Sequence, residues 1–98
     1  LPEAEEVIDQ FGHLTFKVRN KSFVMMGESI AIKAAPSTQE FLLLQDNYFK
    51  TPYIGQHGWV SIRDYERENW ADIAKLIEGG YRLAAPKKLV RQLDEQSG

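Results

Sequence analysis

Basic side chains are the first residues of this sequence whose types and spacing indicate a chemistry, because lysine and arginine bind phosphate groups. Residues 81–91 contain four basic residues and no acidic one. In a helix that begins near Pro86, Lys87 and Arg91 would lie four residues apart on one face, where the positive end of the helix dipole adds to their charge. Two more basic residues flank a predicted turn. The candidate nucleic-acid-binding residues are Arg19, Lys21, Arg82, Lys87, Lys88 and Arg91.

The overall charge argues that such binding is weak. The chain has a net charge of −2, whereas proteins that bind phosphate backbones are usually basic, since counterion release supplies much of their affinity. About two or three phosphate contacts, each with a salt slope of roughly −0.9, would add only a modest affinity. The alternative interpretation is that these side chains form solvated faces that keep the domain in solution.

A second candidate segment, residues 50–63, combines aromatic and hydrogen-bonding side chains in a glycine-containing loop. Such a loop could stack a planar ligand or a base. The alternative is that Tyr53 and Trp59 are core anchors, while Gln56 and His57 bond to loop amides. The candidate pocket residues are Tyr53, Gln56, His57 and Trp59.

Catalytic patterns are missing from the sequence. The two histidines, His13 and His57, have no second histidine two to four residues away, and there is no H-E-x-x-H, G-x-S-x-G, P-loop or G-x-G-x-x-G motif. The chain contains no cysteine, which excludes a thiolate nucleophile, a thiolate zinc site and a disulfide framework. We therefore expect no enzymatic activity and assign no catalytic residue and no cofactor.

The acidic N-terminal segment is a weak candidate for a metal site. Hard cations need several carboxylate oxygens that converge, but in an extended strand Glu5 and Glu6 would point to opposite faces. We expect a solvated edge that discourages aggregation, and we assign no metal site. The residues concerned are Glu3, Glu5, Glu6 and Asp9.

Composition predicts one globular domain over residues 1–98. Apolar residues make up 43% and charged residues 27% of the chain, far from the composition of disordered proteins. No apolar stretch approaches the ~20 residues that cross a bilayer. Together with the absence of cysteine, this favours a cytoplasmic protein without a membrane partner, and it leaves the oligomeric state open.

Alternation with a period of two predicts three short strands, beginning at Leu14, Ser22 and Ser29. Two-residue turns at Asn20-Lys21 and Gly27-Glu28 would join them into an antiparallel meander, with Gly27 in the first position of a type II′ turn. Within these strands, Phe23 and Met25 are expected to share a buried face, as are Ile30 and Ile32. A last strand is expected over Trp59 to Arg63, after a loop with a brief strand over Lys50 to Gly58.

Three helices are predicted from caps and apolar spacing. After Pro36, the capping box Ser37-Thr38-Gln39-Glu40 precedes a short helix that contains Phe41 to Leu44. Asn69 caps the next helix, which Gly79-Gly80 are expected to end or loosen. The predicted inner stripe of that helix is Trp70, Ile73, Ala74 and Ile77, and that of a final helix starting at Pro86 is Leu89, Val90 and Leu93.

Four stretches, in their order and spacing, are similar to a known family. They are Phe16-Lys17-Val18-Arg19-Asn20-Lys21-Ser22-Phe23, Lys50-Thr51-Pro52-Tyr53 with His57-Gly58-Trp59-Val60, Asn69-Trp70, and Tyr81-Arg82-Leu83-Ala84-Ala85-Pro86-Lys87-Lys88-Leu89. On these residues the chain resembles the MmcQ/YjbR-like family, small proteins with a CyaY-like fold. The resemblance covers residues 1–89.

The resemblance implies an α+β fold, an antiparallel sheet with helices packed on one face. It also implies an N-terminal helix that ends near a Leu-Pro-Glu stretch. Because this chain starts at Leu1-Pro2-Glu3, we expect that helix to be absent from it and Glu6 to Gln10 to form the first strand. Gly79-Gly80 depart from the family pattern, which has helix-compatible residues there.

For function the resemblance implies only a double-wing DNA-binding arrangement, with the two predicted turns as wings. This is an analogy of fold, which does not by itself imply function. We therefore expect a non-enzymatic binding module with DNA as the leading partner. The alternative is a small-molecule or peptide pocket in the aromatic loop.

Overall fold

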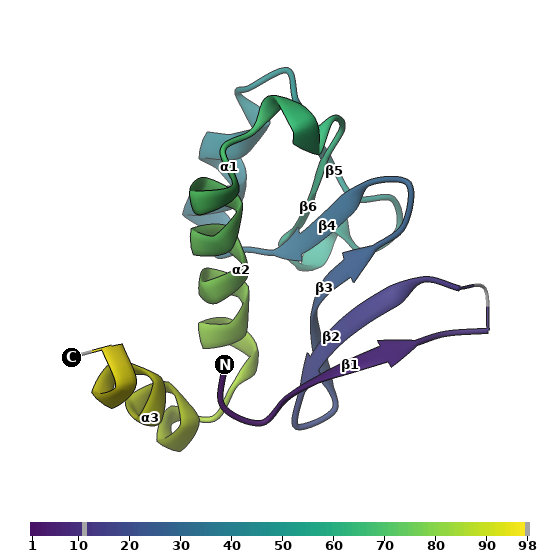
Figure 1. Ribbon diagram of the computed structural model, residues 1–98. Coiled ribbons are helices and arrows are strands. Elements are labelled where there is room, and N and C mark those ends of the chain that lie inside the picture. The colour runs from purple at the N-terminus through teal and green to yellow at the C-terminus, as the bar shows by residue number, and fades with distance from the viewer. Residues whose placement is uncertain (11, 98) are drawn as a thin grey trace.

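A computed structural model describes residues 1–10 and 12–97, and in this part of the chain six strands form one antiparallel sheet (Figure 1). The order across the sheet is β1-β2-β3-β4-β6-β5, and every neighbouring pair is antiparallel. The predicted α+β fold is thereby confirmed. The strands are β1 Ala4–Ile8, β2 Leu14–Val18, β3 Lys21–Met26, β4 Ile30–Lys33, β5 Tyr48–Lys50 and β6 Trp59–Ile62.

The α1, α2 and α3 helices of the described residues lie on one side of this sheet (Figure 1). They are α1 Pro36–Leu43, α2 Trp70–Ala84 and α3 Lys87–Ser97, and short 3-10 helices cover Gly55–His57 and Tyr65–Arg67. The core forms where α2 crosses β3 and β4. Val24, Ile32 and Val60 are register partners on neighbouring strands, so they share the face that the helices cover.

A β-bulge changes the expected faces of β3. Lys17 pairs with Ser22 and Phe16 with Val24, which leaves Phe23 as the extra residue. Because the bulge interrupts the alternation, Phe23 and Val24 are both buried in the core. The prediction that Phe23 and Met25 share a face is therefore wrong. Ile30 and Ile32 are both buried in the core, as expected.

Both hairpin connections differ from the predicted ones. Arg19 and Asn20, with φ of 50° and 66°, occupy the central positions of the β2–β3 turn, so the turn lies one residue earlier than expected. The β3–β4 connection has three residues, Gly27 to Ser29, between the paired Met26 and Ile30. Gly27 does not adopt a positive φ, so the predicted type II′ turn is wrong.

The short helix α1 exists, but its predicted cap does not. It begins at Pro36 with Ala35 as the N-cap and no side-chain cap hydrogen bond, so the proposed capping box lies inside the helix. Proline fits this first position because its missing N–H has no intrahelical partner there. Of the expected apolar run, only Leu42 is buried, while Phe41 and Leu44 are exposed.

Helix α2 is longer than predicted. Its Asn69 cap is confirmed, since the Asn69 side chain accepts a hydrogen bond from the amide of Ala71. Gly79-Gly80 do not end it, because the helix continues to Ala84. The buried residues of α2 are Ile73, Gly80, Tyr81 and Ala84, so Trp70 and Ala74, both exposed, were wrong members of the predicted stripe.

The last helix and the first strand lie close to their predicted positions. In α3, Leu89 and Leu93 are buried in the core and Val90 is half-buried. Pro86 immediately precedes this helix, and its carbonyl accepts from the amides of Leu89 and Val90. The first strand exists, but it begins two residues earlier than predicted, at Ala4.

The adjacent glycines of α2 have different surroundings. At Gly80 an added Cβ would lie 2.9 Å from the carbonyl oxygen of Lys33 and 3.2 Å from that of Phe23. At Gly79 an added Cβ would meet no atom within 4 Å. Gly80 therefore lets α2 approach the sheet backbone closely, whereas Gly79 has no such role.

This difference predicts opposite effects of one substitution at neighbouring positions. Gly79→Ala should raise the free energy of unfolding by about 0.5–1 kcal/mol, because alanine favours the helix. Gly80→Ala should lower it, since the overpacking cost of about 1–3 kcal/mol outweighs the same gain in propensity. Urea unfolding followed by circular dichroism measures both. A shift of both variants in the same direction would contradict the packing described for Gly80.

Candidate functional site

The β2–β3 turn and the start of α3 meet at the first residues of the chain. Arg19 forms a bidentate pair with Glu3, with its Nε donating to Oε1 at 2.8 Å and a terminal nitrogen donating to Oε2 at 3.0 Å. The hydrogen bonds from Arg19, together with the positive charges of Arg19 and Lys88, hold the pKa of Glu3 below its ordinary value. Arg19 and Lys88 therefore lie near the same carboxylate, and the turn and the helix share one surface.

A buried tyrosine holds the N-terminal residues in this place. The hydroxyl of Tyr81 donates to the carbonyl oxygen of Pro2 at 2.6 Å, and its ring packs edge-on against Phe23. Burial raises the pKa of Tyr81, with a further contribution from the charge of Glu3. Because the Tyr81 side chain is fixed in the core, the position of Glu3 depends on it.

Two of the six predicted phosphate-binding residues already have carboxylate partners. Arg19 is paired with Glu3, and Arg82 donates to Glu78 at 3.0 Å and to Asp94 at 2.6 Å. The hydrogen bond to Asp94 is the main reason that the pKa of Arg82 is raised. These arginines are therefore not free cations.

The other four predicted residues are exposed, and no direct ion pair involves them within residues 1–10 and 12–97. Lys87 and Arg91 lie one helical turn apart and line a shallow cavity of about 360 Å³ with Arg82, Ala85 and Val90. Lys88 is close enough to Glu3 for its charge to lower the pKa of that carboxyl. The start of α3 thus presents three exposed cations, two of which line a concave surface, and Lys21 follows the neighbouring turn.

The two predicted wings lie at opposite ends of β3. That strand has six residues, and at about 3.3 Å per residue its ends are roughly 17 Å apart. The turn at Arg19-Asn20 is beside α3, while the connection Gly27 to Ser29 lines a separate cavity with Asp9 and His13. Consecutive turns of a meander necessarily alternate between ends. Only the Arg19-Asn20 turn is therefore on the side of α3, and the double-wing DNA-binding arrangement stays a prediction.

The four aromatic-loop residues differ in burial within the described part of the chain. Tyr53 is 97% exposed, so it is not the core anchor considered as the alternative, whereas Trp59 is buried in β6. Gln56 and His57 are exposed. None of the five cavities described for residues 1–10 and 12–97 is lined by any of the four. The ligand pocket in this loop stays a prediction.

The loop is held by a residue that the sequence did not point to. The side-chain amide of Gln39, on α1, donates to the carbonyl oxygens of Gly55 at 2.8 Å and Trp59 at 3.0 Å. Gly58 adopts φ of 95° where an added Cβ would lie 2.4 Å from the carbonyl oxygen of Ala34. These contacts give the loop a structural explanation that needs no ligand.

Comparison with known proteins decides the family. A family model described as YjbR matches residues 1–83. The chain belongs to the YjbR family. A search of the curated proteins finds no match. The matched region includes the whole sheet and nearly all of α2 but ends before α3, so three of the candidate cations of this YjbR-family domain, Lys87, Lys88 and Arg91, lie outside it.

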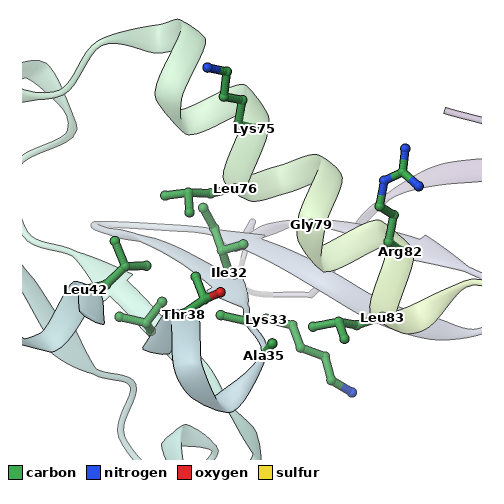
Figure 2. A pocket seen from close by; sticks show the side chains of 12 residues that line it. Ile32, Lys33, Ala35, Thr38, Leu42, Lys75, Leu76, Gly79, Arg82 and Leu83 are labelled. Carbon is green, nitrogen blue, oxygen red and sulfur yellow. The ribbon is translucent and has the colours of Figure 1, made fainter. Parts of the chain in front are cut away.

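The structure of this YjbR-family domain also contains an apolar groove that sequence reasoning missed. It lies between α1 and α2 and has a volume of about 250 Å³ (Figure 2). Sequence reasoning missed the groove because its walls come from four separate elements, which only the fold brings together. A local signal was available at Gly79, a helix-interior glycine without a packing role. The residues that form most of its walls are Ile32, Thr38, Leu42, Leu76, Gly79 and Leu83.

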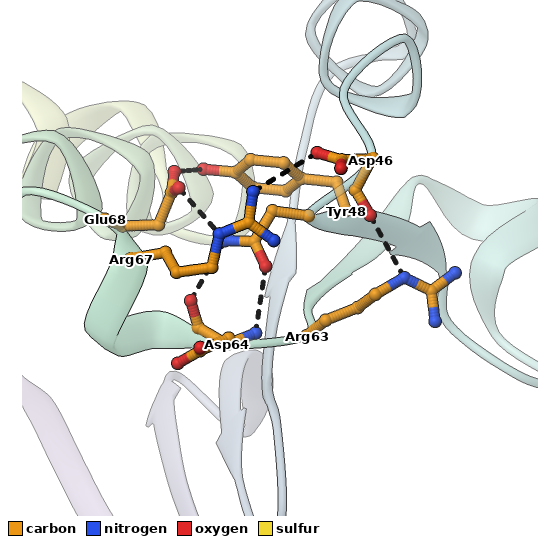
Figure 3. Close-up of polar contacts among 7 residues, drawn as sticks. Asp46, Tyr48, Arg63, Asp64, Arg67 and Glu68 are labelled. Atoms are coloured by element: carbon orange, nitrogen blue, oxygen red, sulfur yellow. Dashed lines mark hydrogen bonds and ion pairs between the residues drawn. The ribbon is translucent and has the colours of Figure 1, made fainter.

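A polar cluster joins the end of β6 to the start of β5 (Figure 3). The carboxylate of Glu68 accepts hydrogen bonds from the hydroxyl of Tyr48 and from the amide of Asn47. Asn47 also exchanges two hydrogen bonds with the backbone of Asp64. Burial and the bond to Glu68 raise the pKa of Tyr48. Because these groups satisfy one another, we assign the cluster a structural role.

Residues 1–10 and 12–97 contain no group of three histidine, aspartate or glutamate side chains placed to hold a metal ion. None of their helices has the length and apolar character needed to cross a membrane.

The raised pKa of Tyr48 predicts a loss of stability in alkali. The folded state keeps this proton to a higher pH than the unfolded chain, whose tyrosines titrate near pH 10, so the stabilisation is complete below about pH 10 and declines above it. Tyr48→Phe should reduce the decline of the unfolding free energy between about pH 10 and 11.5, by at most ~1.4 kcal/mol per pH unit. Tyr53→Phe, at an exposed ring, is the control. A Tyr48→Phe profile parallel to wild type would contradict this assignment.

Proposed function

We propose that this domain is a non-enzymatic binding module that contacts the phosphate backbone of DNA through the start of α3 and the adjacent β2–β3 turn. The observation that carries the proposal is that Lys87, Lys88 and Arg91 are exposed at the start of α3 and form no ion pair within residues 1–10 and 12–97. Lys87 and Arg91 line one cavity with Arg82. The charges of Lys88 and of Arg19, in the β2–β3 turn, both lower the pKa of Glu3, which supports including that turn in the contact.

The same geometry limits the affinity. Arg19 and Arg82 are engaged by carboxylates, so we assign the phosphate contacts chiefly to Lys87, Lys88 and Arg91. Three contacts correspond to a salt slope of about −2.7. Backbone contacts of this kind carry little sequence information, because base edges are read in the grooves. We therefore expect weak, sequence-independent binding that is strong only at low salt.

Charge reversal at α3 tests the proposal. Lys87→Glu combined with Lys88→Glu should weaken binding to a short DNA duplex at least about ten-fold at roughly 50 mM salt. Fluorescence anisotropy measures it, with wild-type binding expected in the micromolar range. Lys33→Glu combined with Lys75→Glu changes the net charge equally on another surface and should have a smaller effect. No wild-type binding at this salt, or equal losses in both double variants, would refute the proposal.

Removing the carboxylate of Glu3, which pairs with Arg19, provides an independent test. Glu3→Gln keeps the shape of the side chain but frees Arg19 for phosphate, so DNA affinity should rise and the salt slope should steepen by up to about 0.9. The measurement is a salt titration of the same duplex with both proteins. Weaker binding by Glu3→Gln, with the fold intact by circular dichroism, would show that this surface does not contact DNA.

A further inference from the structure

The apolar groove between α1 and α2 plays no part in the proposed DNA contact, and one of its walls contains an unexplained residue. Glycine is unfavourable in a helix interior, where only proline is worse. Gly80 is required by the close approach to the sheet, but an added Cβ at Gly79 would meet nothing within 4 Å. Gly79 lines the groove, so any side chain there would project into it. A close approach by another molecule's backbone would explain the glycine.

The groove continues along α2 beyond this first cavity. A second cavity of about 290 Å³ shares Leu42, Lys75 and Leu76 with the first and extends to Phe41 and Asp72. Together they follow α2 from Asp72 to Leu83, which is roughly 16 Å at ~1.5 Å per residue. These two cavities together form a trough along α2, and the trough is long enough for about three turns of another helix.

Large apolar side chains remain exposed along this trough. Phe41, in the second cavity, is 63% exposed, and Leu83, in the first, is 47% exposed. Figure 2 shows Leu42 and Leu76 directed into the space between the helices, while the amino group of Lys75 points away from it. Apolar side chains exposed along a groove are typical of protein docking surfaces. A shallow trough of this length therefore suits a helix.

The charges beside the trough select the partner. Lys33 and Lys75 lie on opposite sides of the first cavity (Figure 2), and neither forms an ion pair within the described ranges 1–10 and 12–97. Arg82, also at this cavity, is held by Glu78 and Asp94. Two free cations flanking an apolar floor are complementary to carboxylates on both flanks of a docked helix.

We propose that this groove binds an amphipathic helix of a partner protein, with apolar residues in the groove and acidic residues along both flanks. The backbone of the partner passes over Gly79, and its carboxylates meet Lys33 and Lys75. Asp72, at the far end of the trough, favours the positive N-terminal end of the bound helix. The partner helix therefore runs from Asp72 toward Leu83, parallel to α2.

Designed peptides test the proposal with the full chain. The probe is a fluorescent peptide of about fifteen residues with leucines at i, i+3, i+4 and i+7 and glutamates on both flanks. We expect a dissociation constant of about 10–100 µM by anisotropy. One control peptide carries serine in place of each leucine, and the other carries lysine in place of each glutamate; both should bind at least about ten-fold more weakly. No binding of the glutamate peptide at about 1 mM would overturn the proposal.

Filling the groove separates binding from folding. Gly79→Leu places a side chain in the groove and improves helix propensity, so peptide affinity should fall at least about ten-fold while the melting temperature rises. Ala74→Leu, at an exposed position of α2 that lines neither cavity, is the matched control and should keep wild-type affinity. Equal affinity of Gly79→Leu and wild type would overturn the proposal.

Charge reversal tests the flanks and separates this proposal from DNA binding. Lys33→Glu with Lys75→Glu should weaken the glutamate peptide and strengthen the lysine peptide, whereas Lys87→Glu with Lys88→Glu should leave both unchanged. The groove could instead be an interface between copies of this chain. A wild-type dimer in sedimentation that Gly79→Leu converts to a monomer would establish that outcome and overturn the proposal.

Discussion

The close approach of α2 to the sheet at Gly80 is the constraint on which the rest of this domain depends. Only a residue without a side chain lets the helix backbone come within reach of the Lys33 and Phe23 carbonyl groups of two neighbouring strands. The next residue, Tyr81, is completely buried, and its ring meets that of Phe23 at a centroid distance of 5.6 Å. These two contacts set both the depth and the rotation of α2. Neighbouring elements take their positions from this helix.

The basic surface depends on α2 through a chain of polar contacts. A buried tyrosine hydroxyl needs a hydrogen-bond partner, and Tyr81 finds it in the carbonyl of Pro2. The adjacent Glu3 is thereby placed to pair with Arg19 of the β2–β3 turn, and the charge of Lys88 on α3 also lowers its pKa. The carboxylate fixes the position of Arg19, and it also neutralises the charge of that arginine. The contact that positions Arg19 therefore also removes it as a free cation, so fewer positive charges remain to bind phosphate. This fits the low affinity expected of the proposed binding module.

The groove follows from the same placement of the helix. Successive residues of an α-helix are separated by about 100° around its axis. With Gly80 directed at the sheet, Gly79 must face sideways, toward α1, where it lowers the wall of the groove. Arg82 lines both this groove and the shallow cavity at α3, but Glu78 and Asp94 engage its charge. The two proposed binding surfaces are therefore adjacent but chemically distinct, one cationic and one mainly apolar.

Local patterns in the sequence determined the strands of the meander, the Asn69 cap and the inner stripe of α3, because these depend on neighbours within a few residues. The resemblance of four short stretches also identified the family. Only the tertiary structure decided the bulge at Phe23 and the continuation of α2 through Gly79-Gly80, since pairing and packing overrode alternation and propensity. Likewise, the basic residues could be named from the sequence, but not which of them are neutralised: Arg19 and Glu3 are sixteen residues apart. The sequence offered one local sign of the groove, the glycine at position 79, but only the tertiary structure decided its shape, which depends on the spacing of two helices.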